Sequence, residues 1–168
     1  MSEPTTPLPA QKATGGDERT VLYGYLDYHR AVLARKADGL SDHDARRAAC
    51  PPSDLTLLGL IRHMTDVERW WFRRWFVDED VPPLFDDDEE WRVPADATAA
   101  GALDAYWSEI RAADANIKPA SLDDGGRLET DPDKASLRRA IVHMIEEYAR
   151  HCGHADLLRQ AIDGSTGD

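Results

Sequence analysis

Residues 55–77 read LTLLGLIRHMTDVERWWFRRWFV and carry the clearest helical pattern in the chain. Apolar side chains recur along this stretch at three- and four-residue spacing, which is the period of one face of an α-helix. These side chains are Leu57, Leu60, Ile61, Met64, Val67, Trp71, Phe72 and Trp75. The segment from Pro51 to Asp54 comes directly before the stretch and supplies turn and cap residues. The stretch therefore predicts a long helix with one buried face.

Three further segments have the same period, at about residues 17–37, 98–117 and 136–162. Ser136 is expected to cap the last of them, and Gly164 follows directly after its end. No segment of useful length alternates with the period of a β-strand. Four amphipathic helices of this length predict an all-α protein that forms a four-helix bundle.

The connections divide the chain into a tail and one domain. Residues 1–16 are rich in Pro, Thr and Gly and cannot supply a packed face, so we expect a flexible tail. Residues 17–168 suit a single domain of ordinary size. Prolines interrupt residues 78–96, which predicts a long ordered loop between the second and third helices, anchored by Trp91. The acidic run 86–90 lacks the spaced ligands and the glycine of a calcium loop, so we expect it to be solvated.

Charge and composition exclude several classes of protein. The chain has 32 acidic and 20 basic residues, a net charge of −12 that repels nucleic acid and anionic lipid. It has no run of 18 apolar residues and no secretory signal pattern, so we expect a cytoplasmic protein with no membrane partner. The only cysteines, Cys50 and Cys152, are too few for a disulfide framework and are expected to stay free. Glu68 falls on the apolar face of its helix, where pairing with an arginine is the simplest explanation.

A second stretch, IEEYARHCGHA at residues 145–155, concentrates groups that can bind metals. On a helical wheel its Glu147, His151 and His154, together with the preceding His143, lie within about 80° of one another. This stripe borders the apolar face, with His151 innermost, whereas Glu146 points to the opposite flank. Side chains three or four residues apart can share one ion, so the spacing allows either Glu147 with His151 or His151 with His154.

Two ligands make an incomplete site, because catalytic zinc takes three protein ligands and a water. Of the remaining histidines, His43 falls in an expected loop, and His29 lies in the first helix. His63 lies in the middle of the second helix at the margin of its apolar face and is the best candidate for a third ligand. From the residues alone, a hydrogen-bonded structural histidine or a salt-bridged helix flank remains the commoner explanation.

The two stretches together resemble a known family. LTLLGLIRHMTDVERWWFRRWF with HMIEEYARHCGHADLLRQAIDGSTG is similar to the DinB-like superfamily of four-helix bundles, in its actinobacterial mini-circle protein branch. The similarity covers residues 17–168 and extends to mycothiol-dependent maleylpyruvate isomerase and thiol S-transferases. The family's metal site has one histidine in the second helix and a His-x-x-x-His pair in the last. The resemblance therefore implies His63, Glu147 and His151 as metal ligands, with Glu147 replacing the commoner histidine as it does in the isomerase. His154 is assigned to contact with a metal ligand or with the bound cofactor or substrate, and a plain surface residue is the alternative.

The resemblance also implies an activity. It is that of a metal-dependent thiol S-transferase, in which a thiolate activated by the metal attacks a small electrophile. Zinc is the first choice of metal and nickel the second, and the thiol is mycothiol or a similar low-molecular-weight thiol. The isomerase relatives carry a further carboxy-terminal domain, so we do not expect their reaction itself.

Two other expectations complete the prediction. A noncatalytic bundle that binds a metal or small ligand, in stress response or regulation, is the alternative function. A homodimer is also expected, because Trp70, Trp71, Trp75 and Trp107 exceed what a small core needs.

Overall fold

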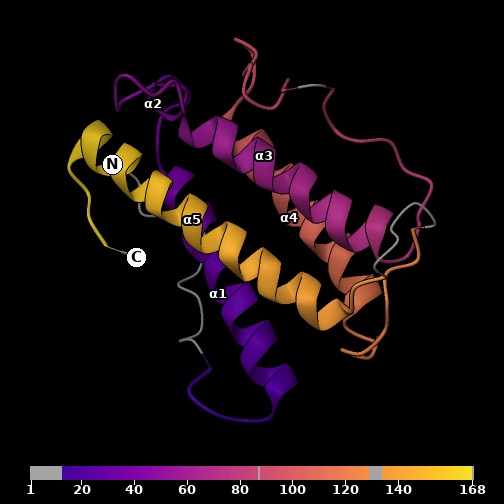
Figure 1. The fold of residues 1–168 in the computed structure, drawn as a ribbon. Coiled ribbons are helices and arrows are strands. Elements are labelled where there is room, and N and C mark those ends of the chain that lie inside the picture. The colour runs from indigo at the N-terminus through magenta and orange to yellow at the C-terminus, as the bar shows by residue number, and fades with distance from the viewer. Residues whose placement is uncertain (1–12, 87, 129–133, 168) are drawn as a thin grey trace.

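The computed structural model describes residues 13–86, 88–128 and 134–167. All the regular secondary structure in this part of the chain is helical (Figure 1). The elements are α1 (Glu18–Ala37), α2 (Asp42–Ala45), α3 (Leu57–Arg69), the π-helical turn η1 (Trp70–Trp75), α4 (Ala99–Ile117) and α5 (Leu137–Asp163). Over the described ranges no β-strand is formed, and Gly125 and Ser136 make only an isolated antiparallel bridge. The predicted all-α fold is confirmed.

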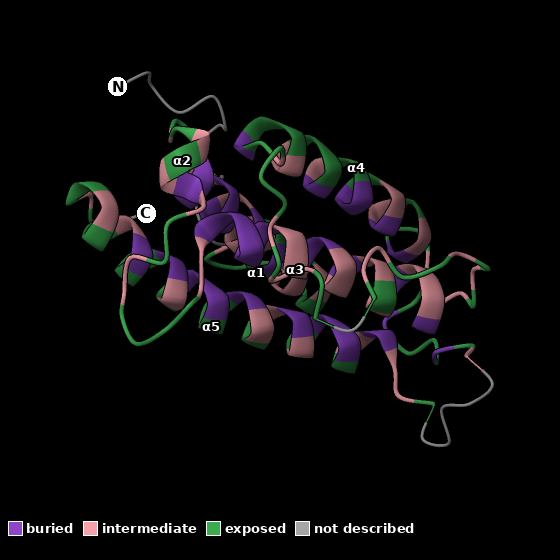
Figure 2. Ribbon diagram, turned by 90° about the horizontal axis from the view of Figure 1, so that it is seen from above, coloured by how far each residue is buried: buried purple, intermediate pink, exposed green. Residues whose placement is uncertain are grey.

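The four long helices form a bundle of two pairs. α1 packs along α5, α3 packs along α4, and α3 also contacts both α1 and α5 (Figure 1). In Figure 2 the buried residues of the helices face the centre of the bundle and the exposed residues face outward. α3 and α5, which carry the predicted ligands, are therefore neighbours in the fold.

Short polar side chains start the helices. Asp17, Thr56, Thr98 and Ser136 each accept a hydrogen bond from the backbone N–H three residues later, at the first turns of α1, α3, α4 and α5. Gly164 ends α5 in the left-handed conformation, with φ of 80°. The caps at Ser136 and Gly164 are the predicted ones. The cap of α3 was predicted too early, because Thr56 and not the segment before it takes this role.

The second predicted helix is not continuous. α3 ends at Arg69, and the chain then widens into η1, where the Phe76 N–H donates to the Trp71 carbonyl over 3.1 Å. A π-helical turn contains an extra residue, which changes the direction of the side chains that follow it. Trp75 and Phe76 are both buried, while Trp71 lies at the rim with its ring 4.7 Å from that of His143.

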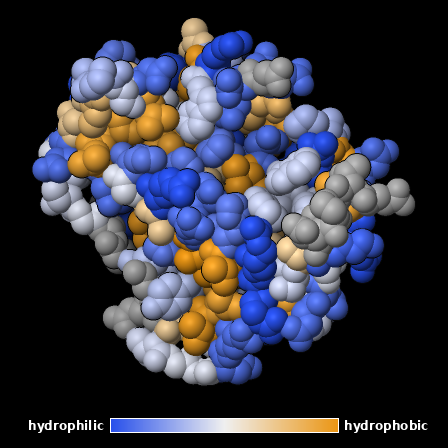
Figure 3. Space-filling model, in the orientation of Figure 1, coloured by the Kyte–Doolittle hydropathy of each residue, from blue (hydrophilic) through white to orange (hydrophobic). Residues whose placement is uncertain are grey.

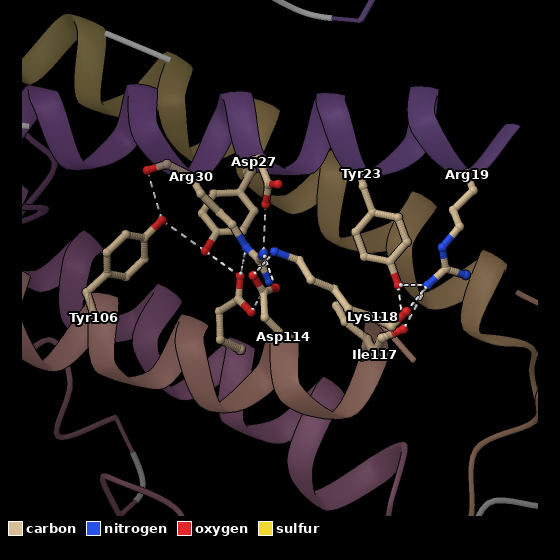
Figure 4. Close-up of polar contacts among 10 residues, drawn as sticks. Arg19, Tyr23, Asp27, Arg30, Tyr106, Asp114, Ile117 and Lys118 are labelled. Atoms are coloured by element: carbon tan, nitrogen blue, oxygen red, sulfur yellow. Dashed lines mark hydrogen bonds and ion pairs between the residues drawn. The ribbon is translucent and has the colours of Figure 1, made fainter. Parts of the chain in front are cut away.

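A buried ionic network joins all four long helices (Figure 4). Arg30 of α1 is 1% exposed and donates to both carboxylate oxygens of Glu68 of α3, each over 2.7 Å. It also donates to Asp114 of α4 over 2.9 Å. Tyr148 of α5 donates to Glu68 over 2.7 Å, and Tyr106 of α4 shares a hydrogen bond with Tyr148. The predicted pairing of Glu68 with an arginine is confirmed.

The surface agrees with the composition. No helix in the described part is long and apolar enough to cross a membrane. On the face drawn in Figure 3, hydrophilic residues surround several separate hydrophobic patches. Neither Cys50 nor Cys152 forms a disulfide, and Cys152 is buried with its Sγ 3.7 Å from the carbonyl oxygen of His29. The predicted flexible tail falls mostly on residues 1–12, which lie outside the described residues, and the division into a tail and one domain stays a prediction.

Candidate functional site

Three predicted ligands come together where α3 lies beside α5. The imidazole rings of His63 and His151 have centroids 4.9 Å apart. The Nε2 atom of His151 lies 3.5 Å from Oε2 of Glu147, one helical turn earlier on α5. His151 is 9% exposed, and the side chains of Glu147 and His63 are 19% and 22% exposed. The cluster is thus sheltered by the bundle yet reachable from solvent.

The chemistry of these side chains fits a zinc ion. Two ligands bound at about 2.0–2.2 Å to one tetrahedral ion are about 3.4 Å apart, which matches the separation of Glu147 and His151. Within residues 13–86, 88–128 and 134–167, however, no group of three His, Cys, Asp or Glu side chains is arranged to hold a metal ion. The Glu147–His151 pair therefore has the required spacing, and the three side chains together would have to rearrange to bind one ion.

Burial keeps His151 in the form that a metal requires. The pKa of His151 is lowered to about 4, mainly by desolvation and also by nearby His63, while the negative charge of Glu147 partly offsets both. The imidazole of His151 is therefore neutral at pH 7. A neutral imidazole keeps one nitrogen lone pair available, whereas a protonated one has none.

Each candidate histidine has an outer partner on its other ring nitrogen. Nδ1 of His63 lies 3.4 Å from Oε1 of Glu90, and Nδ1 of His151 lies 3.4 Å from Nδ1 of His154. Histidines that bind metals almost always use their second nitrogen in this way, which fixes the ring and its tautomer. The structure thus places His154 beside a candidate ligand, which is one of the two roles expected for it, and its contact with a cofactor stays a prediction.

The loop before α4 contributes two residues that sequence reasoning did not assign to the site. The Trp91 ring stacks on His63, with centroids 4.6 Å apart and planes inclined by 26°. Trp91 was predicted as an anchor, but its partner was not. The acidic run was predicted to be solvated, and this is wrong for Glu90, whose side chain is only 17% exposed. A tryptophan directly after five acidic residues was the available signal that this end of the run turns inward.

Two features of α3 hold this loop in place. Arg62 donates from Nε to the Glu90 carbonyl and from Nη2 to the Glu89 carbonyl, both over 3.1 Å. Trp91 also packs against α3 at Gly59, where a Cβ atom would lie 3.4 Å from its ring, an ordinary contact distance. The loop is therefore fixed against the first two turns of α3, directly over His63.

The other histidines have different surroundings. His143 lies on the same side of α5, with Nε2 3.7 Å from Oε1 of Glu147. Glu147 also lies 3.8 Å from Nη1 of Arg150. His43 was predicted in a loop, but it lies in the short helix α2, and its side chain is 86% exposed. His43 thus takes no part in this cluster.

A cleft of about 420 Å³ lies beside Trp91. It is lined by Asp54, Leu55, Thr56, Asp88, Trp91 and Arg92. Carboxylates, a hydroxyl and a guanidinium thus surround one aromatic ring, a combination that suits a small polar molecule. Because Trp91 contacts both His63 and this cleft, a molecule bound in the cleft would lie one indole ring from the candidate metal site.

Comparison with known proteins identifies a family. The family model described as Mycothiol-S-transferase matches residues 21–164, a range that includes both helices of the candidate site. No curated protein and no solved structure matches the chain. The match agrees with the DinB-like resemblance at the level of the family, and the narrower mini-circle branch stays a prediction.

Proposed function

The chain belongs to the mycothiol-S-transferase family, and from this premise we propose that it transfers a low-molecular-weight thiol to a small electrophile in a metal-dependent reaction. The family supports the thiol-transferase role and suggests mycothiol as the cosubstrate. In the reaction the thiol loses its proton to solvent and its sulfur forms a bond to an electrophilic carbon, while the bond from that carbon to a leaving group breaks and the leaving group departs with the electron pair. We place this reaction in the cytoplasm.

We assign the metal to His63, Glu147 and His151, with zinc as the first choice and nickel as the second. Two imidazoles and one carboxylate leave a fourth position free on a tetrahedral ion. When bound, such an ion supplies Lewis acidity that lowers the pKa of a coordinated thiol. The contribution of the protein is to hold three donors on two rigid helices, where packing restricts their rotamers.

The neighbouring residues position the reactants. His154 orients His151 through their contact at Nδ1, with a distance of 3.4 Å. We propose that the polar body of the thiol binds in the cleft beside Trp91, which brings its sulfur within reach of His63. Burial around His151 excludes water from one side of the reacting atoms.

The observation that carries the site assignment is the convergence of His63, Glu147 and His151. His63 and His151 are 88 residues apart in the sequence, yet the centroids of their imidazole rings are 4.9 Å apart. The test is to incubate zinc-loaded protein with mycothiol and a panel of electrophiles, and to follow the conjugates by mass spectrometry. We expect conjugate formation by the wild type and by His43→Ala, and a loss of at least about a hundredfold in His151→Ala.

Other results would point elsewhere. Tight binding of the metal or thiol without turnover of any electrophile would favour the noncatalytic bundle. Equal turnover by the wild type and His151→Ala would contradict the site assignment.

We also propose a homodimer, but fewer tryptophans can contribute to its interface than the sequence suggested. Trp75 is buried in the core of the chain and cannot serve a partner surface. Trp70 is 39% exposed, and the Arg74 guanidinium carbon lies over its indole, 4.9 Å from the centroid of the Trp70 ring. Trp70 is thus the tryptophan to test in a dimer interface.

A further inference from the structure

We infer that Glu90 is a positioning residue for His63: it holds the proton on Nδ1 and thereby presents the lone pair of Nε2 for ligation. The inference rests on the proposed function only where it gives His63 a metal to bind. The pairing itself belongs to the protein without metal, so it can be tested separately.

The chemistry of the pair determines the tautomer. An ionised carboxylate has only acceptor atoms, and a neutral imidazole has one donor nitrogen and one acceptor nitrogen. Oε1 of Glu90 lies 3.4 Å from Nδ1 of His63, so a hydrogen bond between them requires the proton on Nδ1. The lone pair of His63 is then on Nε2, the nitrogen that a metal would use.

Glu90 is held in place by its backbone and by its neighbour. The carbonyls of Glu89 and Glu90 both accept hydrogen bonds from Arg62, the residue before His63 on α3. Trp91 stacks on the ring of His63 itself. Three consecutive loop residues thus contact two consecutive helix residues, which fixes the Glu90 carboxylate over the imidazole at little further entropic cost.

Burial lowers the pKa of Arg62, and the negative charges of Glu90 and Glu89 partly offset this effect. The hydrogen bonds of Arg62 go to the two loop carbonyls, and its guanidinium lies 4.1 Å from the centroid of the Phe85 ring. The carboxylate side chains of Glu90 and Glu147 both lie within the candidate site, so together they offset the two charges of a divalent cation. His151, in contrast, has the imidazole of His154 as its outer partner.

The tautomer can be measured by ¹⁵N NMR of the ring nitrogens in metal-free protein at pH 8, with His63 assigned from the spectrum of His63→Gln. We expect wild-type His63 to carry its proton on Nδ1. Glu90→Ala should lose this preference. The matched control is Glu89→Ala, because Glu89 is the exposed neighbour and contacts Arg62 only through its carbonyl. This control should retain the wild-type tautomer.

Zinc affinity gives the second readout. Competition with a chelator should show about 10–100-fold weaker binding in Glu90→Ala and no change in Glu89→Ala, which is the usual loss on removing an outer partner. Circular dichroism checks that both variants fold. A proton on Nε2 of His63 in the wild type, or equal zinc affinity in Glu90→Ala and wild type, would overturn the inference. A wild type that binds no zinc but has its proton on Nδ1 would contradict the proposed metal site and leave the role of Glu90 in place.

Discussion

The candidate site is built from ring nitrogens that each have a separate partner. His63 and His151 face each other, while Glu90 and His154 contact their Nδ1 atoms. That His63, Glu147 and His151 lie near one another could be predicted from the sequence, because helical spacing put them at the edges of apolar faces and a family resemblance selected among the pairs. Glu90 could not be found, because it lies in a proline-broken loop with no period that predicts its direction.

The contact between His154 and His151 leads to a prediction at this scale. Replacing His154 by alanine removes the partner of Nδ1 but leaves all three proposed ligands, so zinc affinity should fall by about 10–100-fold without being abolished. Gln160→Ala, at an exposed position of the same helix, should bind zinc as the wild type does. Chelator competition measures both. Unchanged affinity in His154→Ala would make His154 a surface residue with no role in the site.

At the scale of elements, the helices were predicted to within about two residues, and the break at Arg69 was not. The six residues of η1 are too few for an apolar pattern to distinguish the π-helical period from the α-helical one. The short helix α2 was also missed, because its four residues are too few to show a period. Both departures lie outside the helical turns that carry His63 and His151, so they do not change the expected positions of these two residues.

The start of α3 gives a prediction that separates the expected cap from the observed one. The Thr56 hydroxyl accepts from the Gly59 N–H over 2.9 Å, whereas the Ser53 hydroxyl contacts only the loop N–H of Leu55. Thr56→Ala should lower the free energy of unfolding by about 0.5–2 kcal/mol. Ser53→Ala should change it by less than about 0.5 kcal/mol. Urea denaturation followed by circular dichroism compares the two variants. A larger loss of stability in Ser53→Ala than in Thr56→Ala would contradict the observed cap and favour the one predicted from the sequence.

At the scale of the whole molecule, the bundle is held by an apolar core with one ionic network inside it. The sequence indicated that Glu68 needs an arginine, because a carboxylate on an apolar face must be paired. It could not say which arginine, since Arg30 and Glu68 are 38 residues apart and meet only when α1 packs against α3. Contacts between helices depend on tertiary packing, which a single sequence does not state.

Removing Arg30 tests this network. Arg30→Leu leaves the fully buried carboxylate of Glu68 without its main partner, and should lower the free energy of unfolding by about 3–5 kcal/mol. The exposed Arg111→Leu should change it by less than about 0.5 kcal/mol. The double variant Arg30→Leu with Glu68→Leu should recover much of the loss, because the fully buried carboxylate is then removed with its partner, while Asp114 keeps Lys118 as a partner. A double variant less stable than Arg30→Leu would contradict this explanation. Urea denaturation measures all three.

Elemental analysis of the purified protein tests the central claim most directly. The claim is that His63, Glu147 and His151 hold a divalent metal that a thiol-transferase reaction requires. We predict about one zinc ion per chain in the wild type and in His43→Ala, and a loss of most of it in His63→Ala, Glu147→Ala and His151→Ala. A wild type that neither contains nor takes up a divalent metal, or ligand variants that retain it in full, would contradict the claim.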